Sequence, residues 1–170
     1  MKRILITSAL LLLAITASSQ ARLDSPKNLR QMAGQSNINL VIFWKSALIV
    51  DVPFNEWVKG EPDWAESETE IRLRFMKSFN GEARGFGAPF RVGTHPDADF
   101  TLVIRVVDVT NDGSKVTSEV SFIDKDRTPI YSDLWVFDDG MFGSVANLMG
   151  DAFALGGKKM IRFLNRHVPY

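Results

Sequence analysis

The stretch ADFTLVIRVVDVTNDGSKVTSEVSFIDKDRTPIYSDLWVF, residues 98–137, decides the fold of this chain. Its first part, residues 98–110, is apolar on both faces of an extended chain, which is typical of a strand in the centre of a sheet. Residues 115–123 alternate between apolar and polar side chains, which predicts a strand with one face toward solvent. Turn-forming residues separate these two strands from each other and from a third at residues 130–137. We therefore expect an antiparallel meander of three consecutive strands.

A further strand is expected upstream of the meander. Residues 38–52, INLVIFWKSALIVDV, are rich in Ile and Val and are interrupted only at Lys45 and Ser46. This pattern predicts a central strand that contains a bend or a bulge.

Two helices are expected after this strand, a short one at residues 53–59 and a long one at residues 62–80, each beginning with a proline. In the long helix the apolar residues Trp64, Ile71, Phe75 and Phe79 fall on one stripe, which is expected to face the sheet. We interpret Trp57 and Trp64 as anchors of these helices. Asn80 and Gly81 are expected to end the long helix, and a short strand is expected near residues 86–92.

The last element is expected to be a helix from Ser144, a good N-terminal cap, to about His167. Gly156 and Gly157 lie in its middle, where each costs about 1 kcal/mol relative to alanine. We expect a close backbone contact at these glycines, and a kink that serves a partner is the alternative.

Together these elements predict an α/β (α+β) fold. We expect a single domain at residues 38–170, with a mixed sheet of four to five strands, an antiparallel three-strand meander and two main helices packed on it. Residues 22–37 are expected to be a polar leader. In it, Asp24 or Ser25 before Pro26 is typical of a helix start, and a loose segment is the alternative.

Residues 1–21 have the three-part pattern of a secretory signal peptide. Lys2 and Arg3 precede an apolar run from Ile4 to Ala17, which is shorter than the roughly 20 residues of a bilayer span. The sequence contains no cysteine, so it offers neither the acylated residue of a bacterial lipoprotein nor a disulfide. We expect export without a transmembrane anchor after cleavage. The periplasm is the expected location, with the cell surface and the medium as alternatives.

Charge argues against nucleic acid as a partner. Acidic and basic residues number 20 each, and loss of Lys2 and Arg3 with the signal peptide leaves the domain slightly negative. Proteins that bind nucleic acid usually carry a basic surface, which this balance does not predict.

Catalytic residues, metals and cofactors are not predicted, although one alternative remains open. His95, Asp97 and Asp99 offer one nitrogen and two carboxylates close together, which would suit a metal-dependent hydrolase centred on His95 and Asp97. The same segment is typical of a turn, in which the aspartates cap the loop. His167 lies near the end of the sequence and is not expected to act as a base.

A binding surface is the other possibility. Trp135, Phe137, Met141 and Phe142 gather around the loop before the last helix, where an apolar surface could receive a peptide, a lipid-like ligand or a partner protein. The alternative is that Trp135 and Phe142 fill the core.

Three segments carry a resemblance to known proteins: NEWVKGEPDW at 55–64, ADFTLVIRVVDVTNDG at 98–113, and GMFGSVANLMGDAF followed by GKKMIRFL at 140–164. Over residues 38–166 the chain resembles a family of uncharacterised exported proteins of Bacteroidetes. In element order it also resembles small α/β domains of envelope assembly factors: the amino-terminal domain of the Tol-Pal propeller protein, the curli-secretion lipoprotein, and lipoprotein activators of penicillin-binding proteins. This resemblance implies an envelope role without implying an activity.

We therefore expect a non-catalytic binding or adaptor domain of the bacterial cell envelope, whose partner is an envelope protein or a peptide or lipid-like ligand. The alternatives are the metal-dependent hydrolase and a periplasmic protein that binds a small ligand or a lipid.

Overall fold

The computed structural model describes residues 25–138 and 143–170, and the expected meander lies within them. Its strands are β5 (Phe100–Val109), β6 (Lys115–Asp124) and β7 (Pro129–Asp138), which pair in that order and antiparallel. The alternation of residues 115–123 is also confirmed, because Val116, Val120 and Phe122 are fully buried on one face of β6.

The strand expected at residues 38–52 is present and is broken where the bend was predicted. β1 (Asn37–Phe43) runs parallel to β5, the chain leaves the sheet over residues 44–47, and β2 (Leu48–Ile49) then rejoins β5 on the same edge. β3 (Val52–Pro53) folds back antiparallel on β2, and β4 (Arg91–Gly93) runs parallel to β1 on its far edge. The sheet thus has seven strands, and its long strands follow the order β1-β5-β6-β7.

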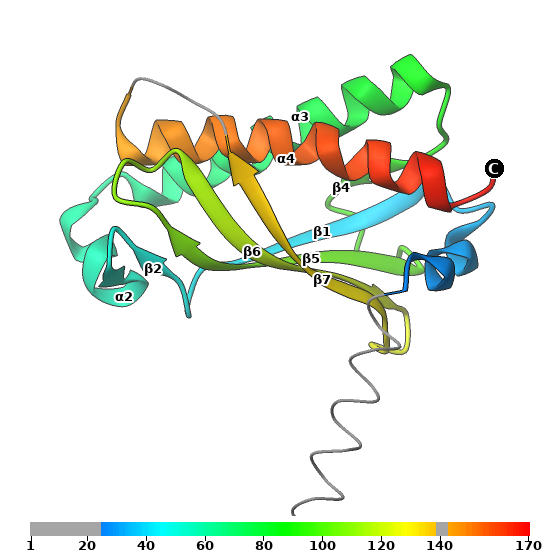
Figure 1. Ribbon diagram of the computed structural model, residues 1–170, viewed down its shortest axis with the longest axis horizontal. Helices are drawn as coiled ribbons and strands as arrows, with labels where there is room; N and C mark the ends of the chain where they lie inside the picture. The colour runs from blue at the N-terminus through cyan, green and yellow to red at the C-terminus, as the bar shows by residue number, and fades with distance from the viewer. Residues whose placement is uncertain (1–24, 139–142) are drawn as a thin grey trace, which may run out of the picture.

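Two long helices, α3 (Trp64–Phe86) and α4 (Val145–His167), lie side by side over one face of the sheet (Figure 1). The short helices η1 (Pro26–Met32), α2 (Phe54–Trp57) and η2 (Val58–Gly60) complete the described chain. This arrangement confirms the predicted α/β fold, with a mixed sheet, a meander and two main helices. The sheet has seven strands where four to five were expected, because the one strand expected at residues 38–52 is divided into β1, β2 and β3. Of the two alternatives for the leader region, the helical one holds for Pro26–Met32, and Leu29 and Met32 are fully buried.

The prediction that Asn80 and Gly81 end the long helix was wrong. α3 continues to Phe86 because Ala83 extends the buried stripe of Phe75 and Phe79 by another turn. The helix ends at Gly87, which has a φ of 68° in the left-handed region, and the Ala88 N–H closes the end on the Ala83 carbonyl at 2.9 Å. The strand expected near residues 86–92 is consequently shorter and begins at Arg91.

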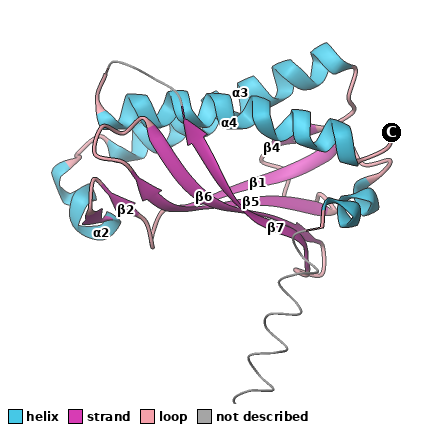
Figure 2. Cartoon of the chain, viewed as in Figure 1, coloured by secondary structure: helices cyan, strands magenta, loops and turns pink. Residues whose placement is uncertain are grey.

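The core lies between the helices and the sheet (Figure 2). Phe153 of α4 is at its centre, with its ring centroid 5.5 Å from those of Trp44 and Phe137 and 6.3 Å from that of Phe75. Trp64 is buried and meets Trp44 edge-on at 5.0 Å, which confirms its role as an anchor. Trp57 in turn packs edge-on against Trp64.

The two glycines of α4 make close contacts, as the sequence predicted. A Cβ atom on Gly156 would lie 2.8 Å from the ring of Phe137, and one on Gly157 would lie 2.6 Å from the Phe75 carbonyl oxygen of α3. Gly156 therefore brings α4 close to β7, and Gly157 brings it close to α3. The packing interpretation of these glycines is confirmed.

Gly157→Ala is expected to lower the free energy of unfolding by about 2 kcal/mol, because the new methyl group overlaps backbone atoms that cannot move aside alone. Gly81→Ala is the matched control. It also lies within a long helix, but its Cβ would meet only the end of the Arg84 side chain at 4.0 Å. It should raise the free energy of unfolding by up to about 1 kcal/mol through helix propensity. Urea unfolding of both variants checks this, and equal effects would contradict the packing account.

The turn between β5 and β6 is closed by one carboxylate. The Thr110 hydroxyl donates to Asp112 Oδ1 at 2.7 Å, and the Ser114 N–H donates to the same oxygen at 3.0 Å. These hydrogen bonds, the one from Thr110 being the stronger, lower the pKa of Asp112 from 3.8 to about 2. The stability that this carboxylate contributes is fully present above pH 3.8 and is lost as the pH falls through about 2.

Thr110→Val should therefore shift the pKa of Asp112 upward toward its ordinary value, because the largest cause of the lowering is removed. Titration of the Asp112 carboxyl group by nuclear magnetic resonance measures the shift. An unchanged pKa in the variant would show that the Thr110 hydroxyl does not hold the carboxylate.

Candidate functional site

The face of the sheet opposite α3 and α4 carries no helix within residues 25–138 and 143–170 (Figure 2). We call this surface the open face. Several large apolar side chains are exposed on it: Leu134 is 62% exposed and Phe43 50%, and Leu48, Val107 and Val136 are also exposed. An exposed apolar surface of this breadth is typical of an interaction site.

The open face differs between its two halves. In the meander, β6 presents Thr117, Glu119 and Ser121, as is usual for an antiparallel strand that faces water. In the parallel half, β1 presents Val41 and Phe43, and β5 presents Val103 and Val107. Parallel strands are usually covered on both faces, and these residues fit that pattern. The outer side of the parallel half thus combines these apolar side chains with polar ones, among them Asn39, Thr101 and Arg105, and no helix of the described chain covers it.

A groove lies at one end of the open face, with a volume of about 680 Å³. Its floor is formed by side chains of β1, β5 and β6, including Val41, Phe43, Val103 and Ile123. One wall is residues 94–99, which connect β4 to β5 and pass over β1. The His95 backbone N–H anchors this wall by donating to Asn39 Oδ1 at 3.1 Å.

The two walls of the groove differ in charge. Residues 94–99 supply Asp97 and Asp99, whereas the turn between β6 and β7 supplies the cations Lys125 and Arg127 together with Asp124. Asp124 shapes that turn, because its Oδ1 accepts the N–H groups of residues 126 and 128 at 2.9 and 2.8 Å. The groove thus has a largely apolar floor between an acidic wall and a wall that carries two cations and one carboxylate.

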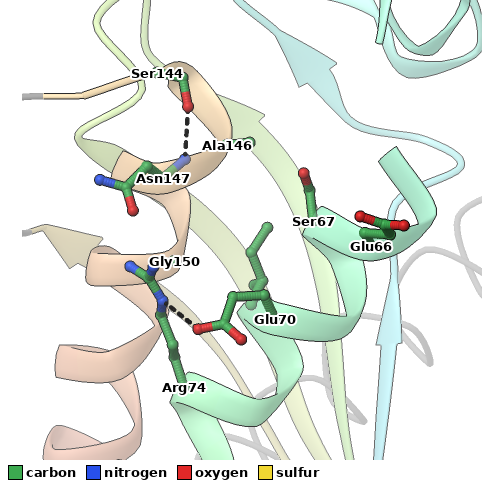
Figure 3. Close-up of a pocket in the computed structure, with 9 residues that line it drawn as sticks. Glu66, Ser67, Glu70, Arg74, Ser144, Ala146, Asn147 and Gly150 are labelled. Carbon is green, nitrogen blue, oxygen red and sulfur yellow. Dashed lines mark hydrogen bonds and ion pairs between the residues drawn. The ribbon is translucent and has the colours of Figure 1, made fainter. Parts of the chain in front are cut away.

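A smaller pocket of about 280 Å³ lies between α3 and α4 (Figure 3). Its cation is already neutralised, because Arg74 pairs with Glu70 at 3.0 Å and with Asp151 at 2.8 Å. Ser144 Oγ accepts the Asn147 N–H as the cap of α4. These contacts serve helix packing, so the open face is the stronger candidate for a functional surface.

Two of the four aromatic or apolar residues expected at a binding surface face the helices. Phe137 is fully buried, and Trp135 is partly buried with its ring 5.2 Å from that of Phe163 in α4. Both side chains therefore contribute to packing under α4. Met141 and Phe142 lie outside the described residues.

The arrangement around His95 is that of a loop. The imidazole lies against Gly93, where an added Cβ would be 2.9 Å from His95 Nε2, and Asp97 and Asp99 are exposed. Within the described ranges, no three or more His, Cys, Asp or Glu residues are placed to hold a metal ion. His167 packs on Phe163 at 4.7 Å.

Sequence reasoning did not identify the open face as the site, although the signal was present. Residues 38–52 and 98–110 carry apolar side chains on both faces, which predicts a central position in the sheet and also a second layer over the outer face.

No helix in the described part of the chain is both long and apolar enough to cross a membrane.

Comparison with known proteins gives only distant similarities. No protein-family model and no curated protein matches the chain. A crystal structure of an uncharacterised protein is 10% identical, covering 76% of this chain and 92% of its own, with a TM-score of 0.44. A PelC dodecamer from Paraburkholderia phytofirmans is 13% identical, covering 81% of this chain and 91% of its own, with a TM-score of 0.41. A Xanthomonas campestris protein of family DUF330 is 10% identical, covering 76% of this chain and 83% of its own, with a TM-score of 0.40.

Proposed function

We propose that this protein is a non-catalytic protein-binding domain of the bacterial cell envelope, and that its binding surface is the open face of the sheet. The observation that carries the proposal is the set of large apolar side chains exposed on this face, which no helix of the described chain covers. Leu134 of β7 and Phe43 of β1 are the most exposed of them.

The shape of the surface favours a protein over a small ligand. Small-molecule sites usually bury 70–90% of their ligand in a concave pocket, whereas the exposed apolar side chains of the open face extend beyond the groove to Leu48, Leu134 and Val136. Apolar side chains here surround an ion pair, Arg105 Nη1 to Glu119 Oε2 at 2.9 Å. Such a mixture of apolar and charged groups is usual in protein interfaces.

The envelope location is supported by the sequence alone. Residues 1–21 have the charged, apolar and small-residue order of an export signal. Membership of the Bacteroidetes family and an adaptor role in the periplasm remain predictions that rest on this pattern and on the resemblance described above.

A photo-crosslinking residue at position 43 tests the binding surface in cells that express the full chain. We expect a discrete protein adduct after illumination, and we expect Leu134→Glu to remove it because a carboxylate would then lie on the same apolar face. Leu73 provides the matched control position, since it is 49% exposed but lies on α3, away from the open face.

If the crosslinking residue gave the same adduct at position 43 and at position 73, binding would not be specific to the open face, and the proposal would be contradicted. An adduct that contains lipid and no protein would instead support the lipid-binding alternative and overturn the proposal.

A further inference from the structure

We infer that the protein bound at the open face is a second copy of this chain, and that the two sheets pack face to face about a two-fold axis. The axis runs parallel to the strands and passes between β5 and β6. This inference rests on the proposed function, since it names the partner of the same surface.

The width of the apolar surface is the first argument. Exposed apolar residues extend from Phe43 on β1 to Leu134 on β7, three strand intervals apart. At about 4.8 Å for each interval, this span is about 14 Å. A single helix is about 10 Å across, whereas a second sheet at the usual distance of about 10 Å would cover the whole surface.

The second argument is a self-complementary row of side chains. Phe43 lies opposite Arg105, Arg105 opposite Glu119, and Glu119 opposite Leu134, so the four lie side by side across the open face. Read across the strands, the row is apolar, basic, acidic, apolar. The two-fold axis between β5 and β6 places Arg105 of each copy against Glu119 of the other and Phe43 against Leu134.

A neighbouring row repeats this property. Leu48 lies opposite Asp108, Asp108 opposite Thr117, and Thr117 opposite Val136. The same axis sets Leu48 against Val136 of the other copy. It also sets Asp108 against the hydroxyl group of Thr117, which can donate a hydrogen bond to the carboxylate.

The charged residues of the groove are also compatible with this axis. Asp97 and Asp99 lie over β1, whereas Lys125 and Arg127, beside Asp124, lie at the turn after β6, on the opposite side of the axis. Rotation therefore brings Asp97 and Asp99 of one copy toward Lys125 and Arg127 of the other, twice in each dimer. A two-fold axis that crossed the strands would instead bring each wall toward the far end of the other sheet. The charges thus favour one axis over the other.

Charge-reversal variants of Arg105 and Glu119 test this inference. They are made in the purified protein without residues 1–21. We expect the wild type to be a dimer by light scattering and sedimentation equilibrium. Arg105→Glu and Glu119→Arg should each weaken dimerisation by at least about tenfold, because each places like charges opposite one another across the interface.

Combining the two charge reversals distinguishes a direct contact between Arg105 and Glu119 of the two copies from a general effect of charge. An equimolar mixture of the two single variants should form a heterodimer, because the glutamates of one copy then face the arginines of the other. The double variant R105E/E119R should also recover the homodimer. Leu73→Glu on α3 is the control and should leave the dimer unchanged, and circular dichroism should show that all variants remain folded.

A wild-type protein that is monomeric at every concentration would overturn the inference. So would a dimer whose stability is unaffected by both single variants, or variants that are not rescued by mixing. If the protein is monomeric but position 43 still crosslinks to another protein in cells, the proposed function stands and only the identity of the partner is wrong. If position 43 crosslinks to no protein, the proposed function fails as well.

Discussion

The parallel pairing of β1 with β5 is the contact on which the rest of the structure depends. It places Ile38, Leu40 and Ile42 under the helices, where all three are buried, and it places Val41 and Phe43 on the opposite side. Because side chains alternate along a strand, a shift of this pairing by one residue would exchange the two sets. The same register that builds the core therefore also creates the open face.

The helical layer follows from this constraint. α3 and α4 cover the inner face. The glycines of α4 allow this helix to lie closer to β7 and to α3 than larger residues would permit. Nothing comparable covers the outer face among the described residues, although Phe43 of β1, Val107 of β5 and Leu134 of β7 are exposed on it. The domain is thus complete on one side of its sheet and has an unsatisfied apolar surface on the other. A binding role is the simplest function that such a surface supports, and a second identical sheet satisfies both its width and its charges.

Much of the fold could be predicted from the sequence because its strongest patterns are local. The alternation in β6, the turn at residues 111–113 and the Ser144 cap each specify an element within a few residues. The end of α3 could not be predicted in this way, because the burial of Ala83 outweighs the helix cost of Gly81 and is a tertiary contact.

The candidate site was missed for a related reason. Aromatic content around residues 135–142 does not reveal which face a side chain takes, and Phe137 is in the core. The open face depends on the cross-strand register, which places Phe43, Arg105, Glu119 and Leu134 in one row although they are far apart in sequence.

The central claim is that the open face is covered when the protein functions. Hydroxyl-radical labelling of Phe43, compared with Leu73 on α3, measures this directly in cells and in dilute purified protein. The account predicts that labelling of Phe43 relative to Leu73 falls several-fold in cells, because only Phe43 becomes buried against a partner. An equal ratio in both conditions would contradict it, since the open face would then remain exposed to water wherever the protein acts.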